Sequence, residues 1–238
     1  MRKFDHNAFV LGLGFVAGFI DVYGFTRLSG LLPAHITGNL IFLAIYIAHG
    51  RFDVLMYVLA LPIFCAGVLG SAWVIGILAE HERDPFLPSL LLEAGLILLG
   101  MLAALHLADA RRASSLGNIV TGSLVMLAMA MQNTLMRLVL NNLPPTTVMT
   151  GNLTQVLSDI LAFTCRFPSI RHTNSERVIL ERQAMRMLLT LLSFLFGAVV
   201  SGVSGRYLGD YDLMMPVAAL LVLIPLGQRS LRARAPQA

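Results

Sequence analysis

The sequence predicts an all-α fold, a polytopic bundle of transmembrane helices, and three observations lead to this prediction. Hydrophobic residues make up 57% of the 238 residues and charged residues only 13%, about half the charged share of a typical soluble domain. Charge-free stretches recur along the chain at the lengths that a bilayer requires, and one tetrapeptide occurs twice. We therefore expect residues 1–238 to form a single transmembrane domain made of two repeated halves, residues 8–107 and 116–227.

Eight apolar segments follow one another along the chain. Most of them approach the roughly 20 residues that a helix needs to cross a bilayer. The second is short, and the sixth carries Gln155, Ser158 and Asp159, so neither is expected to face lipid on all sides. The segments cover residues 8–29, 33–49, 54–79, 88–107, 116–140, 145–164, 185–205 and 213–227.

The first apolar segment follows Arg2 and Lys3, an arrangement that also occurs in signal peptides. We predict that it is retained as the first helix, because Asp21 interrupts it and a similar segment appears later. The third segment has no charge between Val54 and Ala79. The fourth carries Glu93 about one turn from its start, where we expect the carboxylate to reach the membrane interface.

The distribution of Lys and Arg predicts that both termini are cytoplasmic, because cytoplasmic loops are rich in these residues. With eight spans, all of the 17 Lys and Arg residues are cytoplasmic except Arg27, Arg83, Arg137 and Arg206. An alternative has six spans and treats the second and sixth segments as re-entrant half-helices. The charge count does not choose between them, and we favour eight spans because six would place Arg111 and Arg112 outside.

The repeat is clearest at the tetrapeptide Thr-Gly-Asn-Leu, which occurs at residues 37–40 and again at 150–153. Each copy follows a proline-containing turn and stands near the start of an apolar segment. The preceding segment has a polar interruption in both halves, Asp21 in the first and Gln132 with Asn133 in the second. Small residues four positions apart also match, which is typical of close helix packing in membranes: Gly67 and Ser71, then Gly197, Ser201 and Gly205.

These motifs resemble those of the YoaK family of bacterial multi-spanning membrane proteins. The resemblance rests on Gly18-x-x-Asp21, the stretch from His35 to Asn39, Ala130 to Asn133, and Thr146 to Asn152. It covers nearly the whole chain and implies a bacterial inner-membrane location. The family is uncharacterised, so the resemblance implies no substrate, cofactor or catalytic residue.

Asp21 is the first candidate for a functional residue, because a carboxylate inside a membrane helix costs roughly 2.5 to 3.5 kcal/mol and needs a partner, water or a proton. It is expected either to bind a proton during transport or to pair with Arg27 or another helix. Gln132 and Asn133 occupy the matching position, where their amides can hydrogen-bond between helices.

The two Thr-Gly-Asn motifs are expected to bind a polar or anionic solute, because free N–H groups and the positive dipole end gather at a helix start. Alternatively, the motif residues bind one another and hold the two halves together. Asp159 would line a solute path or simply lie in water near the cytoplasmic end. The motif residues concerned are Thr37, Asn39, Thr150 and Asn152.

Other functions have little support in the sequence. The net charge of +4 reflects arginines beside apolar segments, so nucleic acid is not an expected partner. No P-loop, His-Glu-x-x-His or Gly-x-Ser-x-Gly motif occurs, and His35 and His106 are expected near helix ends without a Cys/His cluster. We therefore expect no enzyme, no metal and no cofactor. A homo-oligomer is left open.

The most favoured function is a small secondary transporter or a channel-like carrier of a polar or anionic solute, embedded in the lipid bilayer. This hypothesis depends on the repeat, the paired polar interruptions and the intramembrane carboxylate. The alternative is a membrane-embedded binding or scaffold protein, whose small-residue stripes and Arg-rich loop at residues 166–186 engage partner chains or anionic lipid.

Overall fold

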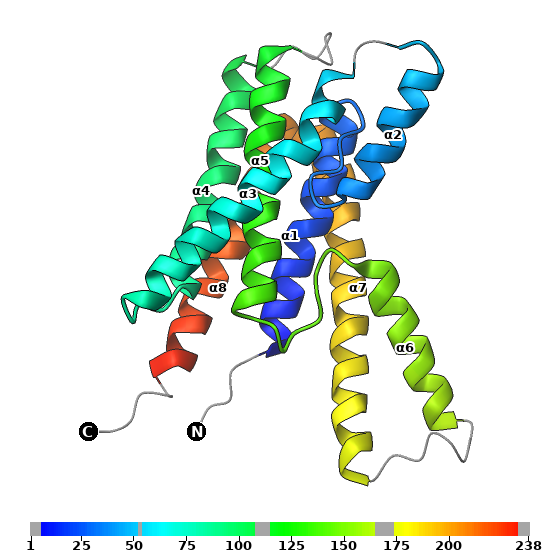
Figure 1. Ribbon diagram of the computed structural model, residues 1–238, viewed down its shortest axis with the longest axis vertical. Helices are drawn as coiled ribbons and strands as arrows, with labels where there is room; N and C mark the ends of the chain where they lie inside the picture. Colours follow the sequence, from blue (N-terminus) through cyan, green and yellow to red (C-terminus); the bar gives the residue numbers. More distant parts are fainter. Residues whose placement is uncertain (1–5, 52–53, 108–114, 165–173, 233–238) are drawn as a thin grey trace.

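The computed structural model describes residues 6–51, 54–107, 115–164 and 174–232, and in these residues it contains helices and no strand. Figure 1 shows a bundle of long helices with two shorter ones at its side. The elements are α1 (His6–Arg27), α2 (Ile36–Ala48), α3 (Leu55–Glu80), α4 (Phe86–Leu107), α5 (Leu116–Leu138), α6 (Met149–Thr164), α7 (Asn174–Leu208), the 3-10 turn η1 (Gly209–Leu213) and α8 (Met214–Arg232).

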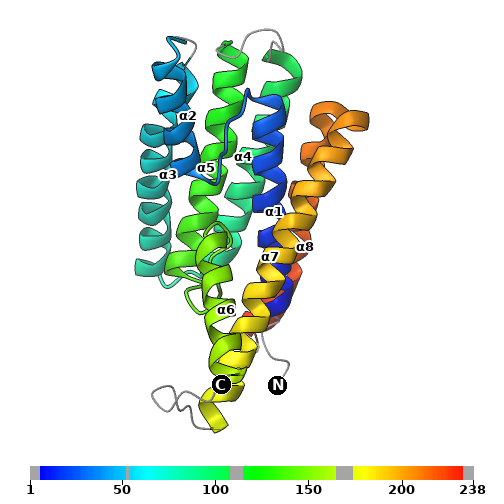
Figure 2. The same cartoon turned by 90° about the vertical axis from the view of Figure 1, so that its right-hand side faces the viewer.

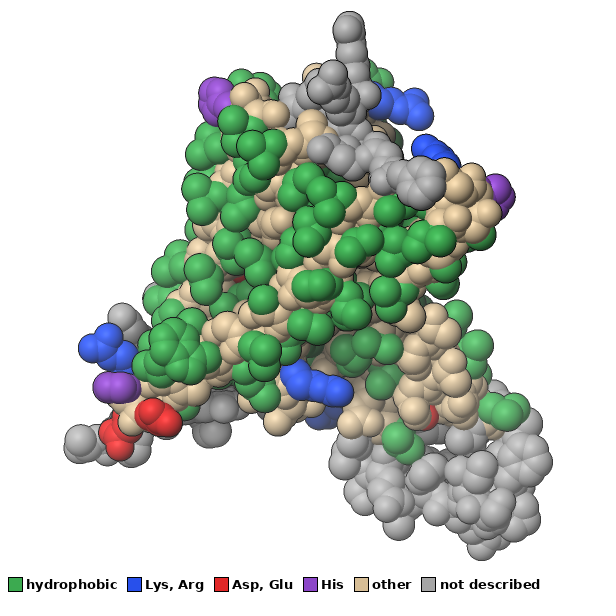
Figure 3. All heavy atoms as spheres, turned by 45° about the horizontal axis from the view of Figure 1, so that its top comes forward, with side chains coloured by type: hydrophobic (Ala, Val, Ile, Leu, Met, Phe, Trp, Pro, Cys, Tyr) green, Lys and Arg blue, Asp and Glu red, His purple; other side chains and the backbone are tan. Residues whose placement is uncertain are grey.

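Five stretches of the described chain are long and apolar enough to cross a membrane. The last of them, Leu180–Leu226, contains α7 and α8, which run in opposite directions (Figure 1). In the view of Figure 3 hydrophobic side chains cover the flank of the bundle, and charged ones gather towards its two ends. The chain is therefore a multi-span membrane protein. The other four stretches are Asn7–Arg27, Leu55–Glu80, Phe86–Leu107 and Leu116–Leu138.

The helix α2 is too short to cross a bilayer. It contains 13 residues, about 20 Å at 1.5 Å per residue, against a hydrocarbon core of roughly 30 Å. The part of α6 that the structure describes contains 16 residues and reaches the edge of the described range at Thr164. Both views place α2 in one half of the bundle's height and α6 in the other (Figures 1 and 2). The expectation of eight full crossings therefore fails at the second segment, α2.

The helices α1 and α5 form the centre of the bundle. Two thirds of the residues in their apolar windows are buried, 67% in each case, against 22% for α3. α1 packs on α7 and α8, whereas α5 packs on α3 and α4. Side chains of α1 such as Phe9, Leu13 and Phe19 are fully buried in the hydrophobic core. The polar residues of α1 and α5 are therefore held inside the protein.

Small residues lie where helix backbones approach closely. A methyl group at Gly197 of α7 would overlap the carbonyl oxygen of Phe15 on α1. A methyl group at Gly67 of α3 would stand 2.7 Å from the Cβ of Ala130 on α5, less than the roughly 3.5 to 4.0 Å of a normal carbon contact. These glycines face helices of the same chain. The other residues of the two stripes are also buried or half-buried within the bundle: Ser71, Ser201 and Gly205.

Candidate functional site

Asp21 is held by the coil that follows α1. Positive φ angles at Ser29 (57°) and Gly30 (91°) turn the chain back towards the bundle, and φ values of this kind favour glycine. The returning coil brings two groups to the Asp21 carboxylate, which is only 4% exposed. The backbone N–H of Ala34 donates to it at 2.8 Å, and His35 Nδ1 forms an ion pair with its other oxygen.

Arg27, which the sequence offered as a partner for Asp21, is engaged elsewhere. Its guanidinium donates to the carbonyl oxygen of Gly205 on α7. Next to it, the Tyr23 hydroxyl donates to Asp210 of η1 at 3.0 Å. This end of α1 is thus tied to the α7–η1 junction, and the pairing of Asp21 with Arg27 is not formed.

His35 is a functional candidate that the sequence analysis set aside as an interfacial histidine. The hydrogen bond that His35 donates to the Asp21 carboxylate raises the pKa of His35 above its usual value. The imidazole of His35 and the ring of Phe194 on α7 pack in a T-shaped, edge-on contact, with the ring centroids 5.7 Å apart and an interplanar angle of 79°. The signal that was available is the need of Asp21 for a cation, together with a histidine just before the first Thr-Gly-Asn motif.

The two motif asparagines bind their own coils. Asn39 Nδ2 donates to the carbonyl oxygen of Leu32, and Asn39 Oδ1 accepts from the N–H of Leu32, both at 2.8 Å. Asn152 Nδ2 donates to the carbonyl oxygen of Pro145 at 2.8 Å. Each bond reaches back seven residues and holds the coil against the start of the short helix. The expected bonding of one motif to the other is therefore not what these asparagines do.

The motif threonines are turned away from these bonds. Thr37 and Thr150 are both exposed, and the structure does not bring them together with Asp21. By contrast, Asp159 is only 6% exposed and accepts from Gln155 Nε2 at 2.8 Å. Its other carboxylate oxygen has no partner among the described residues. Of the two alternatives for Asp159, this burial contradicts the one in which its side chain simply lies in water.

Gln132 and Asn133 connect α5 to the coil at residues 139–148. Gln132 Nε2 donates to Thr146 Oγ1 at 2.7 Å and to the carbonyl oxygen of Leu13 on α1 at 2.9 Å. The Thr147 hydroxyl donates to Asn133 Oδ1. These bonds tie α1, α5 and the coil before α6 into one polar network, in which Gln132 is fully buried.

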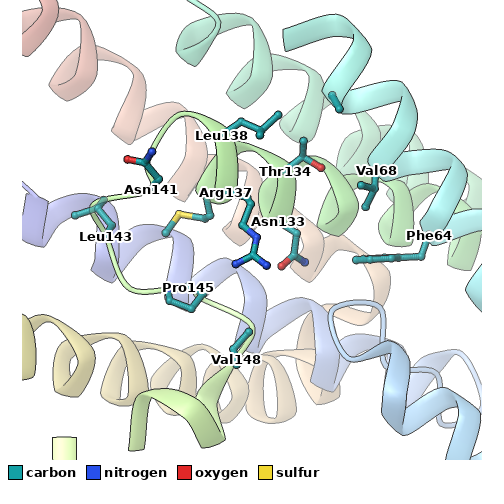
Figure 4. A pocket seen from close by; sticks show the side chains of 12 residues that line it. Phe64, Val68, Asn133, Thr134, Arg137, Leu138, Asn141, Leu143, Pro145 and Val148 are labelled. Atoms are coloured by element: carbon teal, nitrogen blue, oxygen red, sulfur yellow. The ribbon is translucent and has the colours of Figure 1, made fainter. Parts of the chain in front are cut away.

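A cavity of about 680 Å³ opens between α3, the end of α5 and the coil before α6. Figure 4 shows the Arg137 guanidinium and the Asn133 amide pointing into this space, towards Pro145 and Val148. Arg137 is exposed, and no acidic side chain of the described chain forms an ion pair with it. Such a pocket, apolar with a few polar groups, is typical of a small-molecule site.

Arg137 is the second residue that the sequence analysis missed as a candidate ligand. Along the sequence it indicates only topology, because nothing in its neighbours shows that a cavity lies beside it. The signal that was available is its position four residues after Asn133, on the same face of a helix. Among the described residues, no group of three or more His, Cys, Asp or Glu side chains is placed to hold a metal ion.

Comparison with known proteins identifies one family. The model of a family described as a protein of unknown function, DUF1275, matches residues 9–226. No curated protein and no solved structure matches the chain. The match runs from the first turn of α1 into α8 and assigns no activity.

Proposed function

Because the chain belongs to the DUF1275 (YoaK) family, which assigns no activity, we propose from its geometry that it is a small secondary transporter or channel-like carrier of a polar or anionic solute. The cavity beside Arg137 carries the proposal. Within the described residues the Arg137 guanidinium has no acidic partner, and such a group presents donors that match carboxylate or phosphate. Asn133 adds a neutral amide to the same space.

The pairing of helices supports an inverted repeat. Exchanging α1 to α4 with α5 to α8 in order maps each pair of packed α-helices onto another such pair or, for α4 with α8 and α1 with α5, onto itself. The pair α1 with α7 becomes α5 with α3, the pair α2 with α3 becomes α6 with α7, and the pair α4 with α5 becomes α8 with α1. With α2 and α6 as re-entrant half-helices, each half has three spans, and an odd number makes the halves inverted, as in many transporters.

Corresponding places in the two halves differ, and this difference supports a transport cycle. Phe64 and Phe194 each stand three residues before the matching glycines of α3 and α7. In the first half His35 packs on Phe194 and is held by Asp21. In the second half Val148 and Phe64 line the open cavity. One half is thus filled where the other is open, and exchanging these two arrangements would expose a solute alternately to the two sides.

The arginines support an inner-membrane protein with cytoplasmic termini. α1 begins and α8 ends at the same end of the bundle (Figure 1), and the positive-inside rule assigns the more basic end to the cytoplasm. On this proposal the cavity opens towards the cytoplasm. The arginines at that end whose side chains are described are Arg83, Arg137, Arg182 and Arg186, against Arg27, Arg51 and Arg206 at the other.

The first test is thermal unfolding of the purified protein in detergent with phosphate, sulfate, small carboxylates and neutral sugars. A ligand at a hundred times its dissociation constant stabilises the folded state by about 2.7 kcal/mol. We expect an anion to raise the unfolding temperature of the wild type and of Arg206→Gln, an exposed arginine outside the cavity, but not of Arg137→Gln. Anion effects that persist in Arg137→Gln, or none in the folded wild type, would argue against this site.

Transport itself is tested by solute flux into liposomes. Asp21→Asn should lower the flux of the stabilising solute while the protein still folds, because the amide keeps the size of the side chain but loses the ion pair with His35. The rival scaffold function has lost its main support, since the glycines of both stripes contact helices of the same chain. If the protein were a scaffold, the Asp21→Asn variant would keep both its fold and its partner binding. We propose no enzymatic step.

A further inference from the structure

Glu93 is a buried carboxyl group that the proposed solute site does not use. It is the eighth residue of α4 and is 0% exposed, so the expectation that it reaches the membrane interface is wrong. Neither carboxyl oxygen has a hydrogen-bond partner among the described residues. A bare carboxylate at such a place is strongly disfavoured, whereas a neutral carboxylic acid carries one O–H donor and costs far less to bury.

The packing of α4 on α5 places Gln132 opposite Glu93. A methyl group at Gly100 of α4 would stand 3.1 Å from Val125 Cγ1 of α5, so these two positions face each other. Seven residues make about two helical turns and return to the same face. The two helices run antiparallel (Figure 1). Seven residues before Gly100 is Glu93, and seven after Val125 is Gln132.

Gln132 has an unused acceptor at this level. It is 0% exposed, and its Oε1 has no partner among the described residues. Its Nε2 group is already occupied by Leu13 and Thr146. An orphaned amide oxygen therefore stands on the helix face opposite an orphaned carboxyl group, and one proton on Glu93 would supply the missing donor.

The other charged groups near α4 are not bonded to Glu93. The elements that pack on α4 are α5, α8, η1 and, where Phe9 meets Phe86, α1. The described titratable groups of α1 are bonded elsewhere: Asp21 to His35, Tyr23 to Asp210 and Arg27 to Gly205. α5 contributes only Arg137, at the cavity, and the described side chains of α8 contribute no titratable group. η1 contributes Asp210, Tyr211 and Asp212, and Asp210 accepts from Tyr23 of α1. None of these groups forms a hydrogen bond with Glu93.

We propose that Glu93 and Gln132 form a proton-binding site, in which the neutral Glu93 acid donates its hydrogen bond to Gln132 Oε1. Loss of the proton would leave a carboxylate that needs a donor, and the Gln132 amide can supply one by turning. Turning that amide takes its N–H group away from Leu13 of α1 and from Thr146, in the coil that lines the cavity. Proton release at Glu93 thereby loosens the wall of the solute site.

The coupling between proton and solute rests on the proposed transport function, but the protonation itself does not. The test is therefore infrared spectroscopy of the purified protein without any solute, with the pH raised from acid to alkaline. A protonated carboxylic acid absorbs at a C=O stretching frequency separate from that of carboxylates. We expect a protonated band that survives at neutral pH in the wild type and in Asp21→Asn and Asp159→Asn, but is lost in Glu93→Gln.

Two further variants test the role of Gln132. Gln132→Met removes the acceptor at similar volume, so the band should shift to the frequency of a free acid. Thr146→Val removes the bond that holds the amide in place, so the band should disappear at a lower pH than in the wild type. This second variant leaves Gln132 and Glu93 intact, so it also serves if Gln132→Met does not fold.

Several outcomes would overturn the proposal. A band that is absent at neutral pH, or that persists in Glu93→Gln, shows that Glu93 does not hold the proton. A band that is identical in folded Gln132→Met and in Thr146→Val shows that Gln132 is not its partner. Loss of the band on adding sodium chloride at constant pH shows a cation site instead. If the band behaves as expected but anions do not bind at Arg137, the solute site alone is refuted.

Discussion

Replacing Gly197 by alanine should destabilise the crossing of α1 and α7. The new methyl carbon would overlap the carbonyl oxygen of Phe15 and stand 2.9 Å from its carbonyl carbon. Normal carbon contacts are roughly 3.5 to 4.0 Å, so the helices must separate by about 0.5 to 1 Å. A gap of that size forfeits about a quarter to a half of each dispersion contact, and overpacking of this kind costs about 1 to 3 kcal/mol.

The matched control is Gly202→Ala, five residues further along the same helix. A methyl group there meets only Val22 Cγ1 at 3.8 Å, an ordinary contact. Both variants gain about 0.5 to 1 kcal/mol from the higher helix propensity of alanine, so the difference between them isolates the overpacking. Gly202→Ala should be stabilised, and Gly197→Ala should lie about 1 to 3 kcal/mol below it.

The assay is equilibrium unfolding in mixed micelles with increasing dodecyl sulfate, followed by circular dichroism. Gly18→Ala is a second probe of the same crossing, because its methyl group would overlap the carbonyl oxygen of Phe194. Equal unfolding free energies for Gly197→Ala and Gly202→Ala would refute the close approach. Since this crossing places Phe194 against His35, Gly197→Ala should also weaken solute flux.

Two further predictions concern the coil after α1. Asn39→Ala removes both hydrogen bonds to Leu32 and should lower the unfolding free energy by about 1 to 3 kcal/mol, whereas the exposed Thr37→Ala should change it by less than about 0.5 kcal/mol. Because the pKa of His35 is raised, its pairing with Asp21 stabilises the protein fully at a pH below the ordinary histidine pKa of about 6.5. This stabilisation is lost as the pH rises through the raised pKa. His35→Gln should thus lose more thermal stability at pH 5.5, about one unit below the ordinary histidine pKa, than at pH 9, well above that ordinary pKa. An equal loss at both pH values would contradict the ion pair.

The class of the protein could be predicted from the sequence, because the need to keep charge out of the bilayer acts on composition directly. The predicted segments 54–79 and 88–107 agree closely with Leu55–Glu80 and Phe86–Leu107, since charged residues stand at their borders. The segment at 185–205 was too short. α7 begins at Asn174, in a stretch before residue 185 that is rich in polar residues and was therefore left out of the apolar segment.

The span count was less accessible to the sequence. Whether α2 and α6 cross the membrane depends on how long they are and on where they start in the bundle. Where they start depends on how coils 28–35 and 139–148 fold back. Charge counts do not report this, because the two topologies exchange only a few arginines between the two sides. The polar residues of the sixth segment indicate that this segment does not face lipid on all sides, but they do not show where its helix begins.

The sequence by itself determined that this chain is a multi-span membrane protein of the DUF1275 family, and it drew attention to Asp21 and the two Thr-Gly-Asn motifs. Only the tertiary structure decided what these residues contact: Asp21 pairs with His35, and each motif asparagine binds the coil that precedes its own helix. The cavity beside Arg137 also became visible only in the tertiary structure. The physical reason is that apolar burial is a property of single segments, which composition records. Hydrogen-bond partners and cavities depend on distances between segments, which exist only after the helices have packed.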